Sequence, residues 1–154
     1  MSESRVQHNY WAILVATIVA FFLAAGWYTA LTQPWLKGIG RTAEWFRATG
    51  VPPWVSPAGA FVFTFVMAIA ISYVIQVTGP QTMERGMKTG FLLWLGFICT
   101  ALGTEYLYEL RPFMFVINAG FWLISMVIMG VILGAWKKKR TAQLSQERAK
   151  AVVG

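Results

Sequence analysis

Four polar residues in this sequence have the types and spacing to do chemistry: Glu105, Glu109, Arg111 and Asn118. Glu105 and Glu109 are four residues apart and would share one face of a helix. Two carboxylates beside an arginine could bind a proton or a cation, as a small channel or transporter requires. The interpretation that we favour is simpler: an ion-pair network, with an arginine of the turn or of an outer loop, that clamps this loop to the rest of the protein. Asn118 would then hydrogen-bond a neighbouring helix.

The remaining reactive residues are few, and their scarcity excludes several chemistries. One cysteine, Cys99, and one histidine, His8, cannot form an intrachain disulfide, a Cys/His metal cluster or a haem site with two histidines. A quinone-linked thiol oxidase needs cysteine pairs, and a small four-helix drug exporter needs a carboxylate deep in its first helix. No serine, threonine or cysteine has an evident base beside it. We therefore expect a non-catalytic protein without a cofactor or metal. A lipid, quinone or pigment would fit between subunits, although no residue specifies one.

The elements that position these residues are expected to be membrane-spanning helices. Charged residues are 12% of the chain and hydrophobic residues 57%, against about 25% and 45–50% in soluble proteins. Four stretches can cross the ~30 Å hydrocarbon layer as helices, namely residues 10–30, 58–77, 89–108 and 113–136. The sequence thus predicts an all-α membrane protein in which residues 1–154 form a single four-helix domain. Residues 137–154 form its basic tail.

The distribution of basic residues predicts the orientation of the four helices. One basic residue precedes the first helix, two lie in the loop over residues 79–88 and six follow Trp136. The long loop over residues 32–56 has three, and the turn over residues 109–112 has one. Because positive charge stays in the cytoplasm, both termini are expected there. The net charge of +7 is therefore interpreted as a membrane anchor that meets the lipid bilayer, and no nucleic-acid partner is expected.

The ends of the predicted helices carry residues typical of a membrane–water interface, where tryptophan, tyrosine and basic side chains concentrate. The expected interfacial anchors are Asn9, Trp11, Trp27, Tyr28, Trp54, Trp136, Lys137, Lys138, Lys139 and Arg140. Within the long loop, residues 41–48 could form a short interfacial helix, with apolar side chains toward the lipid and charged ones toward water.

Small residues recur every four positions and predict faces at which helices approach closely. The expected helix-packing residues are Ala12, Ala16, Ala20 and Ala24, then Ala60, Thr64, Ala68 and Ser72, and finally Gly96, Gly130 and Gly134. Such faces serve either the packing of the four helices within one chain or contacts between chains. The Gly130-x-x-x-Gly134 motif is the best candidate for contacts between chains.

Two strings of the sequence resemble a bacterial membrane family known as DUF1761, a domain of unknown function. They are residues 9–16, which lead into residues 26–28, and residues 111–122, which lead into residues 129–136. The resemblance extends over residues 9–136 and implies a small four-helix inner-membrane protein, without supplying an activity or a cofactor. The signature positions that it implies are Asn9, Trp27, Tyr28, Asn118 and Gly120.

These features together predict an accessory or structural subunit of the bacterial cytoplasmic membrane. It would associate with other membrane subunits or with copies of itself. The alternative is a small homo-oligomeric channel, or a proton- or cation-coupled transporter, that uses Glu105, Glu109 and Arg111. An enzyme that acts on lipid at the outer leaflet is a third class, suggested only by the two carboxylates on one face.

Overall fold

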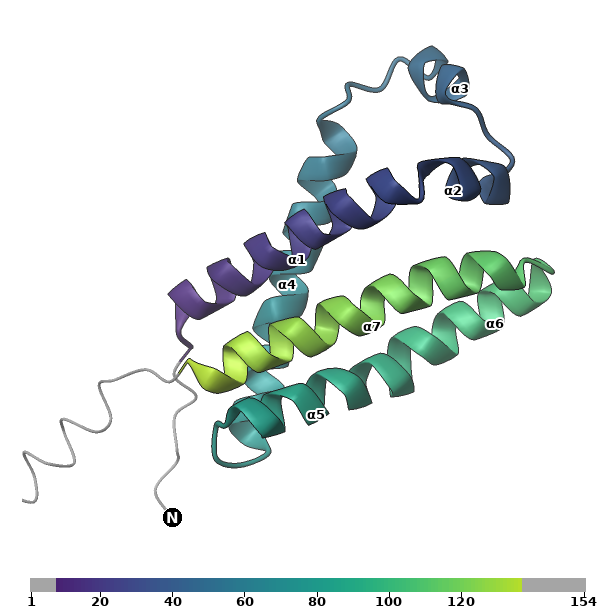
Figure 1. Cartoon of the computed structure of the whole chain (residues 1–154). Coiled ribbons are helices and arrows are strands. Elements are labelled where there is room, and N and C mark those ends of the chain that lie inside the picture. Colours follow the sequence, from purple (N-terminus) through teal and green to yellow (C-terminus); the bar gives the residue numbers. More distant parts are fainter. Residues whose placement is uncertain (1–7, 137–154) are drawn as a thin grey trace, which may run out of the picture.

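The computed structural model describes residues 8–136, and within that range the chain forms helices joined by turns (Figure 1). The helices are α1 (Tyr10–Ala30), α2 (Thr32–Ile39), α3 (Ala43–Ala48), α4 (Val55–Val77), α5 (Met83–Leu93), the π-helix η1 (Trp94–Cys99), α6 (Thr100–Tyr108) and α7 (Pro112–Ala135). The segments α5, η1 and α6 follow one another without a break. Four spans are long and apolar enough to cross a membrane, namely α1, α4, the α5–η1–α6 rod and α7. The predicted four-span, all-α fold is confirmed.

The third span begins at Met83, whereas the sequence predicts a start at residue 89. The hydroxyl of Thr82 accepts a hydrogen bond from the backbone N–H of Arg85 at 3.2 Å and so caps the helix. One turn further on, Lys88 and Glu84 form an i,i+4 ion pair at 2.6 Å. Because hydropathy assigns a charged first turn to a loop, these residues were expected outside the helix.

The long loop contains two helices where one was expected. After a turn at Leu31, α2 continues from α1 and ends at Ile39. The next residue, Gly40, caps it with a φ of 67°, the left-handed conformation that glycine adopts readily. The expected helix over residues 41–48 is α3, which begins after Thr42; the Thr42 hydroxyl accepts from the N–H of Trp45 at 3.2 Å. All of α3 is exposed, and Figure 1 shows it apart from the four spans.

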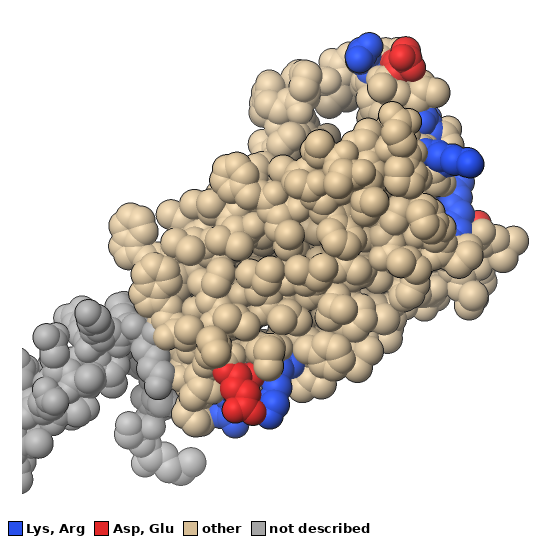
Figure 2. All heavy atoms as spheres, in the orientation of Figure 1, with Lys and Arg blue, Asp and Glu red and all other residues tan. Residues whose placement is uncertain are grey.

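Because the number of spans is even, the two ends of the described chain lie on the same side, next to each other. The amide of Asn9 donates to the backbone oxygen of Trp136 at 3.4 Å. We call this the terminal end; it also holds the turn over residues 78–82. The opposite, or loop, end holds α2, α3 and the turn over residues 109–111. On the face shown in Figure 2, Lys, Arg, Asp and Glu side chains gather at these two ends, and the surface between them carries none.

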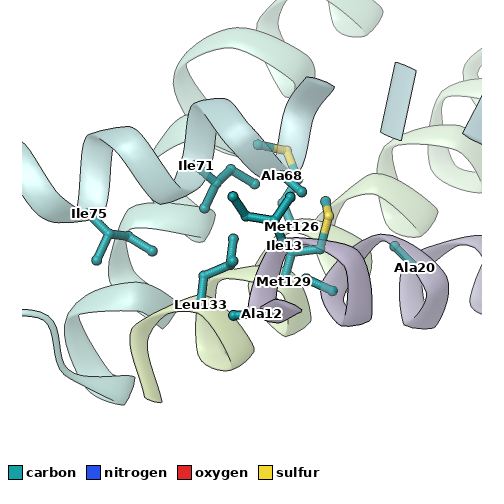
Figure 3. Packing of buried hydrophobic residues seen from close by; sticks show 10 residues of the cluster. Ala12, Ile13, Ala20, Ala68, Ile71, Ile75, Met126, Met129 and Leu133 are labelled. Atoms are coloured by element: carbon teal, nitrogen blue, oxygen red, sulfur yellow. The ribbon is translucent and has the colours of Figure 1, made fainter. Parts of the chain in front are cut away.

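The core lies where α1, α4 and α7 meet, and small side chains bring these helices together. Ala12 and Ala16 of α1 and Ala68 of α4 are at most 1% exposed. Figure 3 shows Ile13, Ile71, Met126, Met129 and Leu133 filling the space between the three helices. Thr64 and Ser72 of the expected α4 stripe are also buried, whereas Ala60 is exposed. The buried members of the two stripes thus serve packing within the chain.

The α5–η1–α6 rod meets α7 by backbone-to-backbone contact at four glycines. A Cβ on Gly86 would collide with the carbonyl oxygen of Gly130, and a Cβ on Gly130 with the carbonyl oxygen of Gly86. Gly90 and Gly134 are equally tight, against Met126 and Thr82. The Gly130-x-x-x-Gly134 motif therefore faces a second motif, Gly86-x-x-x-Gly90, which we had not identified from the sequence. Because both motifs are buried in this contact, they do not offer a surface to another subunit.

Candidate functional site

The strongest polar cluster in the described chain is centred on Asn118, about two turns into α7. The hydroxyl of Tyr28 in α1 donates to Asn118 Oδ1 at 2.7 Å. Asn118 Nδ2 donates to the Tyr106 hydroxyl in α6 at 2.8 Å and to the Met114 carbonyl at 3.1 Å. One amide thus joins three spans. The sequence predicts that Asn118 hydrogen-bonds a neighbouring helix. In the structure it does so with two helices, α1 and α6.

Two tryptophans hold the backbone of α7 on either side of this amide. The indole N–H of Trp27 in α1 donates to the Ile117 carbonyl at 3.2 Å, and that of Trp94 in η1 donates to the Ala119 carbonyl at 2.9 Å. The ring of Trp27 would lie 3.6 Å from a Cβ on Gly120. A Cβ at position 120 would therefore be in ordinary van der Waals contact with the indole. Tyr106 and Trp94 were not among the residues that we singled out, although each is a polar aromatic inside an apolar helix.

The charged residues near this cluster do not form the expected network. Arg111 and Glu109 are 3.7 Å apart with both side chains about half exposed, so their pairing contributes little. Glu105 is exposed, and among residues 8–136 it forms no ion pair. Arg41, one of its expected partners, instead lies 3.7 Å above the ring centroid of Trp45. In the described range, His, Cys, Asp and Glu side chains nowhere gather in a group of three that could hold a metal.

The predicted interfacial anchors divide into two groups. Trp11, Trp54 and Trp136 are exposed at the ends of the bundle. Trp27 and Tyr28 instead direct their polar atoms at α7, as described above, and Asn9 caps α1 by accepting from the N–H of Ala12 at 3.3 Å. Lys137, Lys138, Lys139 and Arg140, like the rest of the predicted tail, lie outside the described residues.

A second polar cluster lies at the terminal end and is separated from Asn118 by the apolar core. His8 Nδ1 is 3.3 Å from the Ser72 hydroxyl, and Gln76 Nε2 donates to the same hydroxyl at 3.2 Å. Between the two clusters, Thr17 and Thr64 donate to carbonyls of their own helices, and the neighbouring side chains are Ala, Ile, Met and Leu. The two clusters are therefore separate, and the described hydrogen bonds do not connect them.

Comparison with known proteins identifies a family but no described activity. The profile of one family, described as "Protein of unknown function (DUF1761)", matches residues 11–134. This range includes Trp27, Tyr28 and the hydrogen-bonded segment over residues 117–120. No curated protein and no solved structure matches the chain.

Proposed function

Because this chain belongs to the DUF1761 family, whose function is unknown, and has four helices long and apolar enough to span a membrane, we propose a role that rests on its geometry. It is a non-catalytic subunit that associates, within the bilayer, with copies of itself or with other membrane subunits. The hydrogen bonds around Asn118 fix one arrangement of the helices, and an outward face of the third span receives the partner.

The observation that carries this proposal is the small share of buried residues in the third span. In its most apolar stretch 6% of the residues are buried, against 28% in each of the first two spans and 44% in the fourth. The rod contacts α7 along one side, and large apolar side chains such as Leu92 and Phe97 are exposed elsewhere on it. In a bilayer such a span is covered by lipid or by another helix.

The residues on this face favour another helix over lipid alone. Gly96, Thr100 and Thr104 follow one another at intervals of four and are exposed, and a Cβ on Gly96 would meet nothing within 4 Å. The Thr100 hydroxyl donates to the Gly96 carbonyl at 2.8 Å, and the Thr104 hydroxyl to the Thr100 carbonyl at 2.9 Å. The face is thus small, flat and without an unpaired hydroxyl, which suits close helix–helix contact in lipid. We call it the Gly96 face.

The proposed location is the bacterial cytoplasmic membrane, with both termini in the cytoplasm. Arg85 and Lys88 lie at the terminal end of the bundle, in the first turns of α5. The basic run that begins at Lys137 follows α7 directly. Positive charge on this end of the spans is the pattern of a cytoplasmic side.

Native mass spectrometry of protein extracted gently from its own membrane tests the proposal. Gly96→Leu should lower the fraction of protein found in assemblies, because the larger side chain keeps a partner helix away. Gly59→Leu is the matched control, since a Cβ on Gly59 also meets nothing within 4 Å but lies on α4. A monomer without partners, or assemblies that tolerate Gly96→Leu, would contradict the proposal.

The channel or transporter alternative has weaker support, since the polar residues that it needs do not continue across the bundle. Between the Asn118 cluster and the terminal end, the buried residues are mostly Ala, Ile, Met and Leu, and the buried polar ones, Thr17, Thr64 and Ser125, carry no charge. If the alternative were correct, Glu105→Gln would abolish a pH-dependent flux in proteoliposomes.

A further inference from the structure

An open groove of about 540 Å³ lies at the terminal end, between the last turns of α4 and the first turns of α5. The groove is lined by polar residues near the start of α5 and by apolar residues further into the span. Arg85, Lys88 and Thr89 line the part near the start of α5, and Leu92, Leu93 and Val74 line the part further into the span. At 1.5 Å per residue, Leu92 lies about 10 Å deeper than Arg85 along the helix.

Arg85 has a buried donor without a hydrogen-bond partner among residues 8–136, its Nη1 atom. The guanidinium lies against Gly79, where a Cβ would collide with Nη1. The nearest carboxylate in sequence, Glu84, is paired with Lys88 at 2.6 Å. A buried charged donor without a partner is costly, so an anion in the groove would stabilise this arrangement.

The charges in the groove favour an anion over a neutral or zwitterionic ligand. Arg85 and Lys88 are cationic and Glu84 is anionic, so these three side chains leave one positive charge in the groove. At the terminal end of a membrane span, this charge lies at the depth of lipid headgroups, which carry phosphate. The apolar residues deeper in the groove match an acyl chain attached to that phosphate.

We propose that this groove binds an anionic phospholipid, with the phosphate on Arg85 and Lys88 and an acyl chain along Leu92 and Leu93. The Arg85 guanidinium turns from Gly79 toward the phosphate and gains the acceptor that it lacks. This site is independent of the Gly96 face and of the proposed association with other subunits.

Binding of phosphatidylglycerol and phosphatidylcholine to the full, delipidated chain in detergent micelles tests the site, with native mass spectrometry to count bound lipids. Phosphatidylglycerol should bind more tightly than phosphatidylcholine, and Arg85→Gln should weaken its binding about tenfold, the usual effect of losing a charged hydrogen bond. Arg47→Gln is the control, because it removes the same charge from exposed α3 at the other end. Equal binding of the two lipids, or equal effects of the two variants, would overturn the proposal.

Two further measurements keep the test decisive. Lys88 is exposed, so Lys88→Gln should fold even if Arg85→Gln does not, and it should also weaken phosphatidylglycerol binding. Inorganic phosphate, added as a competitor, distinguishes a lipid site from a site for free phosphate. Phosphatidylglycerol that stays bound supports the lipid assignment, and its displacement by inorganic phosphate alone overturns it.

Discussion

The Asn118 side chain uses both its oxygen and its nitrogen, with partners on two other spans and on its own helix. In a bilayer no water is available to replace a lost partner, so such an amide holds its helices in one arrangement. A polar residue inside a span is a functional suspect by default. Here the hydrogen bonds give Asn118 a structural role, because its side-chain oxygen and nitrogen both have partners within the bundle.

Asn118→Leu should lower the free energy of unfolding by about 1–2 kcal/mol, the usual value of an interhelical hydrogen bond in a membrane protein. The substitution keeps the size of the side chain but leaves the hydroxyls of Tyr28 and Tyr106 without their partner. Unfolding in a denaturing detergent, followed by circular dichroism, measures the change.

Tyr28→Phe provides the matched test of the same network. The double variant should lose less stability than the sum of the two single variants, because both remove the same hydrogen bond. Tyr108→Phe is the control, since Tyr108 is 86% exposed. Strictly additive effects of Tyr28→Phe and Asn118→Leu would show that the bond contributes nothing.

At the scale of helices, the contact between α5 and α7 depends on the absence of side chains. Gly86 and Gly130 bring the two backbones so close that a methyl group on either one would meet a carbonyl oxygen of the other helix. A carbonyl in a helix cannot move aside as a flexible side chain can. The pair of motifs therefore fixes both the distance and the register of the rod on α7.

Gly86→Ala and Gly130→Ala should each lower the free energy of unfolding by about 1–3 kcal/mol, the usual cost of overpacking. Gly96→Ala should be neutral or slightly stabilising, because the position is open and alanine favours the helix. Thermal unfolding of the three variants in one detergent makes the comparison. Equal midpoints for all three would contradict the close contact.

The short helix α3 should lose stability in acid. The pKa of Glu44 is lowered from its ordinary value of 4.5, chiefly because its carboxylate accepts from its own backbone N–H, and further by the Thr42 hydroxyl. A lowered pKa in the folded state means that this carboxylate stabilises α3 above pH 4.5. The contribution is lost as the pH falls below 4.5 and through the lowered value.

Amide signals of Trp45 and Phe46 in NMR spectra report on α3 during an acid titration. In the native chain they should shift as Glu44 becomes protonated, and in Glu44→Gln this shift should be absent. If the variant shows the same acid transition, the stabilising carboxylate is a different one.

At the scale of the whole molecule, the alternation of four spans puts α3 and the start of α5 on opposite sides of a membrane. In the proposed orientation, in which both termini are cytoplasmic, α3 faces outward and Met83 inward. Ala48→Cys and Met83→Cys, each in a Cys99→Ala background, test this with a maleimide that cannot cross membranes. In intact cells Ala48→Cys should react and Met83→Cys should not, and inverted vesicles should show the reverse. The opposite result would place the termini outside.

Much of the fold follows from the sequence. The first span was expected at residues 10–30 and is Tyr10–Ala30, and the fourth was expected at residues 113–136 and is Pro112–Ala135. A run of this length without charge has one stable form in a bilayer, a helix across it. The third span was placed too late because its first turn is charged. That turn is nevertheless helical: the Thr82 hydroxyl caps it, and Glu84 and Lys88 pair along its exposed side.

The partners of each helix face were decided only by the tertiary structure. Tyr28 and Asn118 are 90 residues apart in the chain, and no local sequence pattern identifies them as partners. The sequence left open whether Gly130 packs within the chain or against another subunit, and the structure places it against Gly86. In water, a helix shows its buried face by hydrophobic periodicity, but a span in lipid is apolar on every side. The sequence therefore determines which segments cross the membrane, whereas the rotation and pairing of the helices depend on close contacts that exist only once the helices have assembled.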